Sequence, residues 1–449
     1  MAEEEFDVIV VGLGPGGEDV AGRLAEAGLR VAGVEAGLVG GECPYWGCVP
    51  SKMMIRAADM IAETRRVPDM AGQATVSPDW SPVAKRIREE ATDDWNDKVA
   101  ADRFTGKGGH LVRGRARITG PGRVTVDGER VLRARRGIVL ASGSQPVVPP
   151  IPGLADTPYW TNHQAIETET VPESLIVVGG GAIGAELAQV FARFGSAVTV
   201  IEAQDRILSM EEPEAGELIG RVFAAEGVDI RTRARAAEVS HDGSRFTLRT
   251  EGGDTVRGER LLVATGRRSD LAALGVAAAG LDESARFVPT DGRMRAAEGV
   301  WALGDIAGKG AFTHMSMYHA NIVVNDILGE PVHEAEYHAV PRVSFTDPEV
   351  GAVGLTEAQA RAKGLDVRTS VSPLETSSRG WIHRAEGLIK LVADGPVLVG
   401  ATSVGPSGGE VLGMLTLAVH ARIPVERLSQ MIYAYPTFHR AVEDAVRRL

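Results

Sequence analysis

The sequence is poor in cysteine and in aromatic residues, and it contains no long uninterrupted hydrophobic run. Only two cysteines occur among 449 residues, Cys43 and Cys48, and aromatic residues make up 5% of the chain. Two sulfurs are too few for a metal site built from cysteine alone, and so few aromatics argue against an aromatic-rich β-sandwich. The most apolar later stretch, residues 175–192, is broken by glycines and two polar side chains, which favours a buried strand, turn and helix over a membrane span.

Basic residues are fewer than acidic ones. The chain has 48 Lys and Arg against 60 Asp and Glu, a net charge of −12 at pH 7. This balance argues against nucleic acid or an acidic membrane surface as a partner. No N-terminal signal is recognisable, because Met1–Glu5 is acidic and the short apolar run Phe6–Val11 leads directly into a glycine motif. We therefore expect a cytoplasmic protein.

Glycine, by contrast, is abundant with 54 residues, and one glycine motif occurs twice. The two copies are Gly12-Leu-Gly14-Pro-Gly-Gly17 and Gly179-Gly-Gly181-Ala-Ile-Gly184. Their surroundings predict a strand, a helix and a strand, at residues 6–12, 18–27 and 30–35 and again at residues 174–179, 184–194 and 197–202. In such a βαβ unit the glycines permit a tight turn, close approach of a pyrophosphate, and packing of helix on strand. The repeat predicts two dinucleotide-binding domains.

An acidic residue ends the second strand of each predicted unit. Glu35 follows Gly14 by 21 residues, and Glu202 follows Gly181 by the same 21 residues. A carboxylate at this position accepts hydrogen bonds from a ribose diol and repels a 2′-phosphate, so Glu202 favours NADH slightly over NADPH. Arg206 is a nearby cation that could offset this repulsion, which leaves the choice open.

The length of 449 residues suits about three domains. Pro-rich residues 145–152 and residues 262–270 each follow a β-type run, and we place the second nucleotide-binding domain between them. The predicted domains are residues 1–145 with 271–335, residues 146–270, and residues 336–449. The last is expected to be α+β, with an antiparallel sheet that includes residues 342–345, 387–392 and 397–404 and with helices at 409–421 and 425–431.

The two cysteines lie five positions apart, directly after the first predicted βαβ unit. They precede a predicted helix at residues 49–58 whose first residues are less regular, and a helix N-terminus stabilises a thiolate. Apart from Glu42, the neighbourhood lacks metal-binding side chains. A local redox pair is therefore favoured over a metal site or a structural disulfide.

Residues 40–52, Gly-Gly-Glu-Cys43-Pro-Tyr-Trp-Gly-Cys48-Val-Pro-Ser-Lys52, closely resemble the active-site signature of the class I pyridine nucleotide-disulfide oxidoreductases. This family includes dihydrolipoamide dehydrogenase, glutathione reductase and mercuric reductase. Further matches lie at residues 141–146, 264–268, 301–305 and 345–349, so the resemblance runs nearly from end to end. It implies an α/β protein in which two Rossmann-like domains bind FAD and NAD(P), in that order, and a C-terminal domain forms a homodimer.

The resemblance also implies roles for individual residues. Cys48 would lie beside the flavin as the thiolate that interacts with it, and Cys43 would be the outer thiol that exchanges with substrate. Lys52 would lie near the reactive flavin nitrogen and pair with Glu186. Contacts with FAD are implied for Asp305, at the ribityl chain, and for the backbone of Ala116 and Gly143; Gly266 and Glu202 would border the nicotinamide nucleotide.

The chain departs from the family near its C-terminus. Typical disulfide reductases there carry His-Pro-Thr-x-x-Glu, whose histidine acts as acid and base, whereas this chain has Tyr435-Pro-Thr-Phe-His439-Arg440. A tyrosine with an ordinary pKa of about 10 is a poor base at neutral pH. His439 lies about one helical turn later and is a candidate replacement, or else an ordinary interface residue.

We expect an FAD-dependent NAD(P)H:disulfide or dithiol oxidoreductase that passes electrons from nicotinamide through FAD to Cys43 and Cys48 and on to a small thiol or disulfide. A second hypothesis is an NAD(P)H-quinone or diaphorase-type reductase that uses the flavin directly, for which the missing histidine has no cost. A third is a flavin-bound redox sensor. No C-terminal cysteine pair follows Tyr435, so we do not expect a mercuric reductase.

Overall fold

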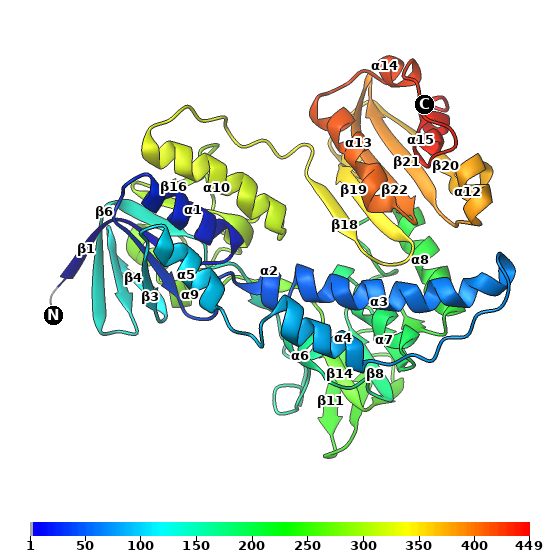
Figure 1. The fold of residues 1–449 in the computed structure, drawn as a ribbon, viewed down its shortest axis with the longest axis horizontal. Coiled ribbons are helices and arrows are strands. Elements are labelled where there is room, and N and C mark those ends of the chain that lie inside the picture. Colours follow the sequence, from blue (N-terminus) through cyan, green and yellow to red (C-terminus); the bar gives the residue numbers. More distant parts are fainter. Residues whose placement is uncertain (1–2) are drawn as a thin grey trace. The chain divides into compact units, whose positions relative to one another are not determined.

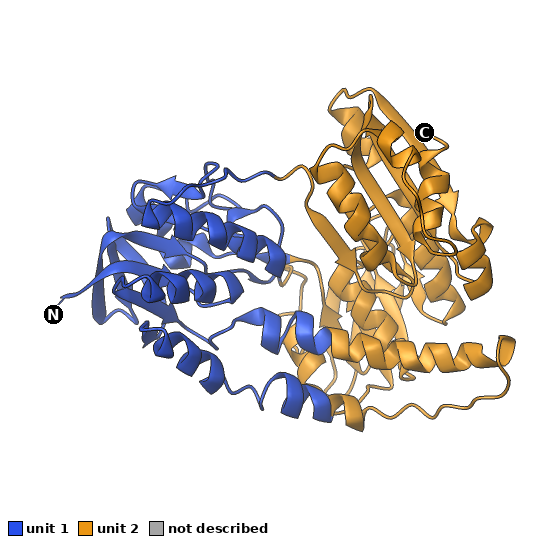
Figure 2. Cartoon of the chain, turned by 45° about the horizontal axis from the view of Figure 1, so that its top comes forward, with its two compact units in different colours: residues 1–51, 85–147, 267–336 blue, residues 52–84, 148–266, 337–449 orange. Residues whose placement is uncertain are grey.

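The computed structural model describes residues 3–449, and Figure 1 labels its helices and strands. The chain divides into two compact units, coloured separately in Figure 2. Unit 1 consists of the residues up to 51 together with residues 85–147 and 267–336, and unit 2 consists of residues 52–84, 148–266 and 337–449. Helices α3 (Cys48–Arg66) and α4 (Ser81–Arg86) each contribute residues to both units.

Unit 1 is built on a mostly parallel sheet. Its strands are β1 (Glu3–Val11), β2 (Val31–Glu35), β3 (His110–Arg113), β4 (Ala116–Gly120), β5 (Arg123–Val126), β6 (Arg130–Leu140), β16 (Arg295–Ala297) and β17 (Val300–Ala302). Their order is β16-β17-β6-β1-β2-β3, and β4 and β5 form an antiparallel hairpin against β6. Separately, β7 (Gln145–Pro146) pairs with β15 (Arg267–Arg268), so two segments distant in sequence form a short antiparallel ribbon.

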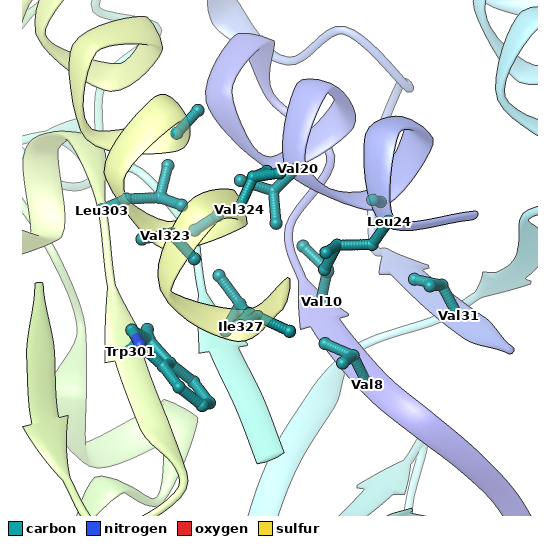
Figure 3. Close-up of a cluster of buried hydrophobic side chains, with 14 of the residues drawn as sticks. Val8, Val10, Val20, Leu24, Val31, Trp301, Leu303, Val323, Val324 and Ile327 are labelled. Carbon is teal, nitrogen blue, oxygen red and sulfur yellow. The ribbon is translucent and has the colours of Figure 1, made fainter. Parts of the chain in front are cut away.

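The helices of unit 1 include α1 and α10, which cover one face of this sheet in Figure 3. The helical segments are α1 (Pro15–Glu26), α2 (Glu42–Tyr45), the π-helix η2 (Ile87–Ala91), α5 (Lys98–Gly106), α9 (Leu271–Leu274), the 3₁₀ segments η3 (Val276–Ala279) and η4 (Gly304–Ala307), and α10 (Thr313–Leu328). Helix α1 begins three residues before its predicted start, because Pro15 at the first position loses no hydrogen bond there.

Successive side chains of β1 point to opposite faces of the sheet, and on both faces they are buried. Val8 and Val10 pack with Leu24 of α1 and Val323 of α10 (Figure 3). Ile9 and Val11 point to the opposite face and belong to a second core. A parallel strand covered on both faces reads as a continuous apolar run, as residues 6–11 do. The packing fixes the end of β1, where the first glycine motif begins.

Unit 2 contains a second parallel sheet and two antiparallel sheets, one of them the three-stranded sheet β11-β12-β13. The parallel order is β10-β9-β8-β14. The elements of this part are α6 (Asn162–Glu167), β8 (Ser174–Val178), α7 (Ala182–Arg193), β9 (Ala197–Ile201), α8 (Pro213–Ala225), β10 (Asp229–Arg231), β11 (Ala236–His241), β12 (Phe246–Thr250), β13 (Thr255–Gly258) and β14 (Arg260–Val263). The predicted second βαβ unit is thus present as β8, α7 and β9.

The C-terminal part of unit 2 is an antiparallel sheet in the order β18-β19-β22-β21-β20, with α13 packed on β19 and β22 and α15 on β20 and β21. Its elements are β18 (Pro341–Ser344), β19 (Glu349–Gly354), α11 (Glu357–Ala362), β20 (Val367–Pro373), η5 (Leu374–Thr376), α12 (Ser378–His383), β21 (Leu388–Asp394), β22 (Val397–Gly405), α13 (Gly408–His420), α14 (Val425–Ser429) and α15 (His439–Val446). The predicted α/β fold with an α+β C-terminal part is observed. Within residues 3–449, no helix is long and apolar enough to cross a membrane.

Candidate active site

The two glycine motifs have the same geometry. Gly12 and Gly179 have φ angles of +92° and +107°, and a Cβ at either position would lie 2.5 or 2.4 Å from a carbonyl oxygen of a neighbouring strand end. A Cβ on Gly17 would lie 2.1 Å from the Gly12 carbonyl oxygen, and the corresponding distance from Gly184 to Gly179 is 2.0 Å. Only glycine therefore fits the turn and the contact between helix and strand in both copies.

The central glycines leave space for a ligand. Gly14 and Gly181 are the N-caps of α1 and α7, and neither helix has a side-chain cap. Apart from the adjoining chain, no atom lies within 4 Å of the position of an added Cβ at either glycine. Helix N-termini of this kind present free N–H groups to a phosphate. Both motifs therefore fit a dinucleotide pyrophosphate.

Glu35 and Glu202 are also held in equivalent ways. Glu35 accepts hydrogen bonds from the N–H groups of Leu13 and Gly37, both at 2.7 Å. Glu202 accepts them from the N–H groups of Gly180 at 2.6 Å and Gln204 at 2.7 Å. A carboxylate has about four acceptor positions, so each retains capacity for ribose hydroxyls.

The second site has a nearby cation that is engaged elsewhere. Arg206 pairs with Asp205 at 3.0 Å and donates to the carbonyl oxygens of Ser209 at 3.1 Å and Glu211 at 3.3 Å. These contacts direct its guanidinium toward the backbone of residues 209–211.

The two cysteines lie at the start of consecutive helices. Cys43 is in α2 and is half-buried, whereas Cys48 is the first residue of α3 and is exposed. The Cys48 Sγ lies 3.5 Å from the Thr313 Oγ1, at the start of α10. The hydrogen bond with Cys48, followed by burial, raises the pKa of the Cys43 thiol. The start of α3 favours an anionic sulfur at Cys48.

Lys52 follows Cys48 by about one helical turn, and the structure brings it together with Glu186 of α7. The Lys52 Nζ lies 2.7 Å from the Glu186 Oε2, and the Glu186 side chain is only 8% exposed. The other oxygen, Oε1, accepts a hydrogen bond from the Phe345 N–H at 2.8 Å. The Phe345 ring lies 4.5 Å from the Lys52 Nζ, a cation–π contact.

Asp305, the residue expected at the ribityl chain, lies in a polar cluster in unit 1. Asp305, in η4, accepts a hydrogen bond from the Ser144 hydroxyl at 2.5 Å. Arg267 donates to the Ser144 carbonyl oxygen at 2.6 Å and pairs with Glu42, next to Cys43, at 3.1 Å. Ser144 and Arg267 were not named as candidate site residues from the sequence, although both lie in matched motifs and join Asp305 in this cluster.

Three further residues were predicted to contact a nucleotide through their backbone: Gly143 and Gly266, which border open space, and Ala116, which lies on a strand. A Cβ on Gly143 or Gly266 would have no atom within 4 Å, and their φ angles are +64° and +115°. Ala116 is buried at the start of β4. Backbone at such glycines can approach a ligand closely.

Tyr435 and His439 lie in the C-terminal part of unit 2. The Tyr435 side chain is 70% exposed, and its hydroxyl donates to the Ser378 Oγ at 2.8 Å. His439 is the first residue of α15 and is half-buried. Among residues 3–449, no three or more His, Cys, Asp or Glu side chains are arranged so that they could hold a metal ion.

Arg193 forms the centre of a buried ion cluster on the same helix as Glu186. Its side chain is 2% exposed and pairs with Asp59 at 2.7 Å, Glu226 at 2.7 Å and Asp347 at 2.8 Å. Burial disfavours the charge of Arg193, yet the Glu226 carboxylate raises the pKa of the guanidinium. Burial raises the pKa of Asp59 to about 6 because Arg193, which it shares with two other carboxylates, offsets only part of the effect.

This cluster gives a pH-dependent stability. Because the folded pKa of Asp59 lies above its ordinary value of 3.8, protonated Asp59 stabilises the fold below about pH 4, and that contribution is lost as the pH rises through 6. We expect Asp59→Asn to remove this loss. As the pH rises from 4 to 7, the free energy of unfolding of the variant should increase by about 2–3 kcal/mol relative to that of the natural protein. Urea unfolding at several pH values measures the difference, and parallel pH profiles would contradict it.

Comparison with known proteins gives consistent matches. Residues 6–320 match the family described as pyridine nucleotide-disulphide oxidoreductase, and residues 340–446 match its dimerisation domain. A mercuric reductase from Acidithiobacillus ferrooxidans is 34% identical, covering 99% of this chain and 82% of that protein. A dihydrolipoyl dehydrogenase from Thermus scotoductus is 33% identical, with coverage of 99% and 97%.

The fold also matches solved structures. The Cu(II) complex of the HOCl-induced flavoprotein disulfide reductase RclA from Escherichia coli superimposes with a TM-score of 0.87 and 26% identity, covering 100% of both chains. LpdA from Mycobacterium tuberculosis gives a TM-score of 0.86 at 26% identity, with 99% of each chain covered.

Proposed function

This chain belongs to the pyridine nucleotide-disulphide oxidoreductase family, as a flavin-dependent enzyme, and we propose that it transfers electrons from NAD(P)H through FAD and the Cys43–Cys48 pair to a small disulfide. The observation that carries this proposal is the placement of both sulfurs at helix starts directly after a dinucleotide-binding motif. The start of α3 favours a thiolate at Cys48, which a structural cysteine pair does not need.

The proposed cofactor sites follow from the two motifs. FAD would be held by unit 1, through Gly12, Gly14, Gly17, Glu35, Ala116, Gly143 and Asp305. NAD(P)H would be held by Gly179, Gly181, Gly184, Glu202 and Gly266. We assign residues 1–145 and 271–335 to the FAD domain, 146–270 to the NAD(P) domain and 336–449 to the dimerisation domain. When bound, the flavin accepts a hydride from the nicotinamide and supplies two electrons to a disulfide.

The chain's own residues perform the thiol exchange. Cys43 attacks one sulfur of the substrate disulfide, gives up its proton, and forms a mixed disulfide while one substrate thiol leaves. The Cys48 thiolate then attacks the Cys43 sulfur, which forms the Cys43–Cys48 disulfide and releases the second thiol. Two electrons pass to the substrate, and two protons complete the two product thiols. Because the pKa of the Cys43 thiol is raised, its attack as a thiolate needs a proton acceptor.

The proposal also includes a preference for NADH and a homodimeric state. Arg206 is occupied by Asp205 and two carbonyl groups, and Glu202 has acceptor capacity, which supports NADH over NADPH. The dimerisation domain supports a homodimer, as do exposed apolar side chains in this domain, Trp381 at 75% and Ile432 at 96%.

Anaerobic titration of the purified protein with NADH and with NADPH tests the proposal. Two electron equivalents are expected to produce a long-wavelength absorption band from a thiolate beside oxidised flavin, with NADH effective at the lower concentration. Direct bleaching without that band would contradict electron transfer to the cysteine pair. It would support the second candidate, direct reduction of a quinone by the flavin, which Tyr435 in place of a basic histidine favours.

Restoring the family's histidine tests the proton acceptor. We expect Tyr435→His to raise kcat for disulfide reduction at pH 7 by about tenfold to a hundredfold, because a group with a pKa near neutral exchanges protons better than a phenol. His439→Gln is the parallel variant, and a comparable loss of kcat there would identify His439 as the natural acceptor. An unchanged rate in both variants would contradict a proton-transfer role for this segment.

A further inference from the structure

The Lys52 ammonium is held by two different groups. Glu186 provides a carboxylate oxygen at 2.7 Å, and Phe345 provides a ring whose centroid lies 4.5 Å from the nitrogen. The Lys52 side chain is 35% exposed, so water is available on its open side. A lysine ammonium is strongly hydrated and sits on a flexible four-carbon stem, so a single ion pair would leave it free to turn toward solvent.

One backbone hydrogen bond connects these two groups to each other. The Glu186 Oε1 accepts the Phe345 N–H at 2.8 Å while its Oε2 contacts Lys52. Lys52, Glu186 and Phe345 therefore form a closed set of three contacts, in which the carboxylate orients the residue whose ring covers the ammonium.

The segment that carries Phe345 is itself fixed on α7. The Asp347 N–H donates to the Gln189 Oε1 at 2.8 Å, and the Gln189 Nε2 donates to the Asp347 carbonyl oxygen at 2.9 Å. The Asp347 carboxylate pairs with Arg193 at 2.8 Å and Arg66 at 2.6 Å. Glu186, Gln189 and Arg193 are three and four residues apart and so share one helix face. The ring position is thus determined by contacts on both sides of Phe345.

We propose that Phe345 is a positioning residue that holds the Lys52 ammonium in place and thereby makes the flavin easier to reduce. The inference rests on the proposed function, in which Lys52 lies beside the flavin. A fixed positive charge stabilises the added negative charge of a reduced flavin, and the stabilisation decreases with distance and with hydration of the cation. The aromatic face disfavours the hydrated, displaced conformations of Lys52.

The flavin midpoint potential, measured against reference dyes in the purified holoenzyme, tests the proposal. We expect Phe345→Leu to lower the equilibrium constant for two-electron flavin reduction by about threefold to tenfold, a negative shift of up to about 30 mV. Phe345→Tyr keeps the aromatic face and is expected to match the natural protein. Phe345→Met, which keeps much of the volume but has no ring, is expected to behave like Phe345→Leu. It can therefore replace the leucine variant in the test if that variant loses FAD.

Lys52→Gln separates this inference from the proposed function. An unchanged potential in Lys52→Gln would overturn the proposed place of Lys52. A lowered potential in Lys52→Gln combined with an unchanged potential in both Phe345→Leu and Phe345→Met would overturn the role of Phe345 alone. In the Lys52→Gln background, Phe345→Leu should cause no further shift, and an additive shift would show that Phe345 acts by another route and would also overturn the inference.

Discussion

We expect Cys43→Ser to lower the rate of disulfide reduction by about 10³-fold or more, while NAD(P)H still reduces the bound flavin. A serine hydroxyl is a far weaker nucleophile than a thiol and cannot form a mixed disulfide, so the exchange step is lost. Hydride transfer to the flavin precedes that step and does not need Cys43. Steady-state turnover with a disulfide measures the expected loss. Anaerobic bleaching of the flavin, measured on the same preparation, checks that NAD(P)H still reduces it.

Two further variants make this result specific. Cys48→Ser should lose disulfide turnover to the same extent, because it leaves no sulfur to resolve the mixed disulfide on Cys43. Ser51→Ala, on the same helix, should retain it, since its hydroxyl only donates to the Cys48 carbonyl oxygen at 3.4 Å. If Cys43→Ser kept full disulfide turnover, the cysteine pair would not be on the electron path. Quinone reduction that survives loss of both sulfurs would favour the diaphorase hypothesis.

The sequence was sufficient to predict the two nucleotide-binding motifs, because their signals are local. Each combines a turn that only glycine fits, a helix start and an acid at the next strand end, all within about 25 residues. The antiparallel C-terminal sheet was also predicted, from alternating apolar residues that the structure places in β18, β21 and β22. The family resemblance and the α/β fold are confirmed by the matches along the chain.

The bounds of α3 were predicted less well. The first residues were predicted to be less regular, but the helix begins at Cys48, because Pro50 in the first helical turn lacks only an N–H that has no partner there. The helix was also predicted to end near residue 58, whereas it continues to Arg66 because the next proline is Pro68. The added length carries Asp59 and Arg66 into contact with Arg193 and Asp347, which are far away in sequence.

Contacts between distant segments explain what the sequence did not predict. Phe345 and Glu186 are 159 residues apart, and Arg267 and Ser144 are 123 apart. Phe345, Arg267 and Ser144 lie inside matched motifs, yet a motif gives residue types and not the partner that each side chain meets. Arg193 carried no signal at all, because an arginine late in an amphipathic helix is usually solvent-exposed.

A second buried cation, Lys390 of β21, is expected to have the largest effect on stability. Its side chain is 3% exposed and its Nζ pairs with Glu212 at 3.0 Å, Glu214 at 2.8 Å and Glu357 at 3.0 Å. Burial opposes the charge, but the three carboxylates outweigh it and raise the pKa of Lys390. Since the folded pKa is raised, the contribution to stability is complete below the ordinary lysine pKa of about 10.4 and is lost only at higher pH.

We expect Lys390→Met to lower the free energy of unfolding by about 3–5 kcal/mol at pH 7, because it leaves the Glu212 carboxylate, 2% exposed, buried without a cation. Urea unfolding of the holoenzyme measures the loss, with exposed Lys363→Met as the matched control. Adding Glu212→Gln to Lys390→Met should restore part of the stability, since the uncompensated charge is removed while the amide can still accept the Glu357 N–H that Glu212 accepts at 2.6 Å. Equal stability of Lys390→Met and Lys363→Met would show that the three carboxylates do not depend on Lys390 for their burial.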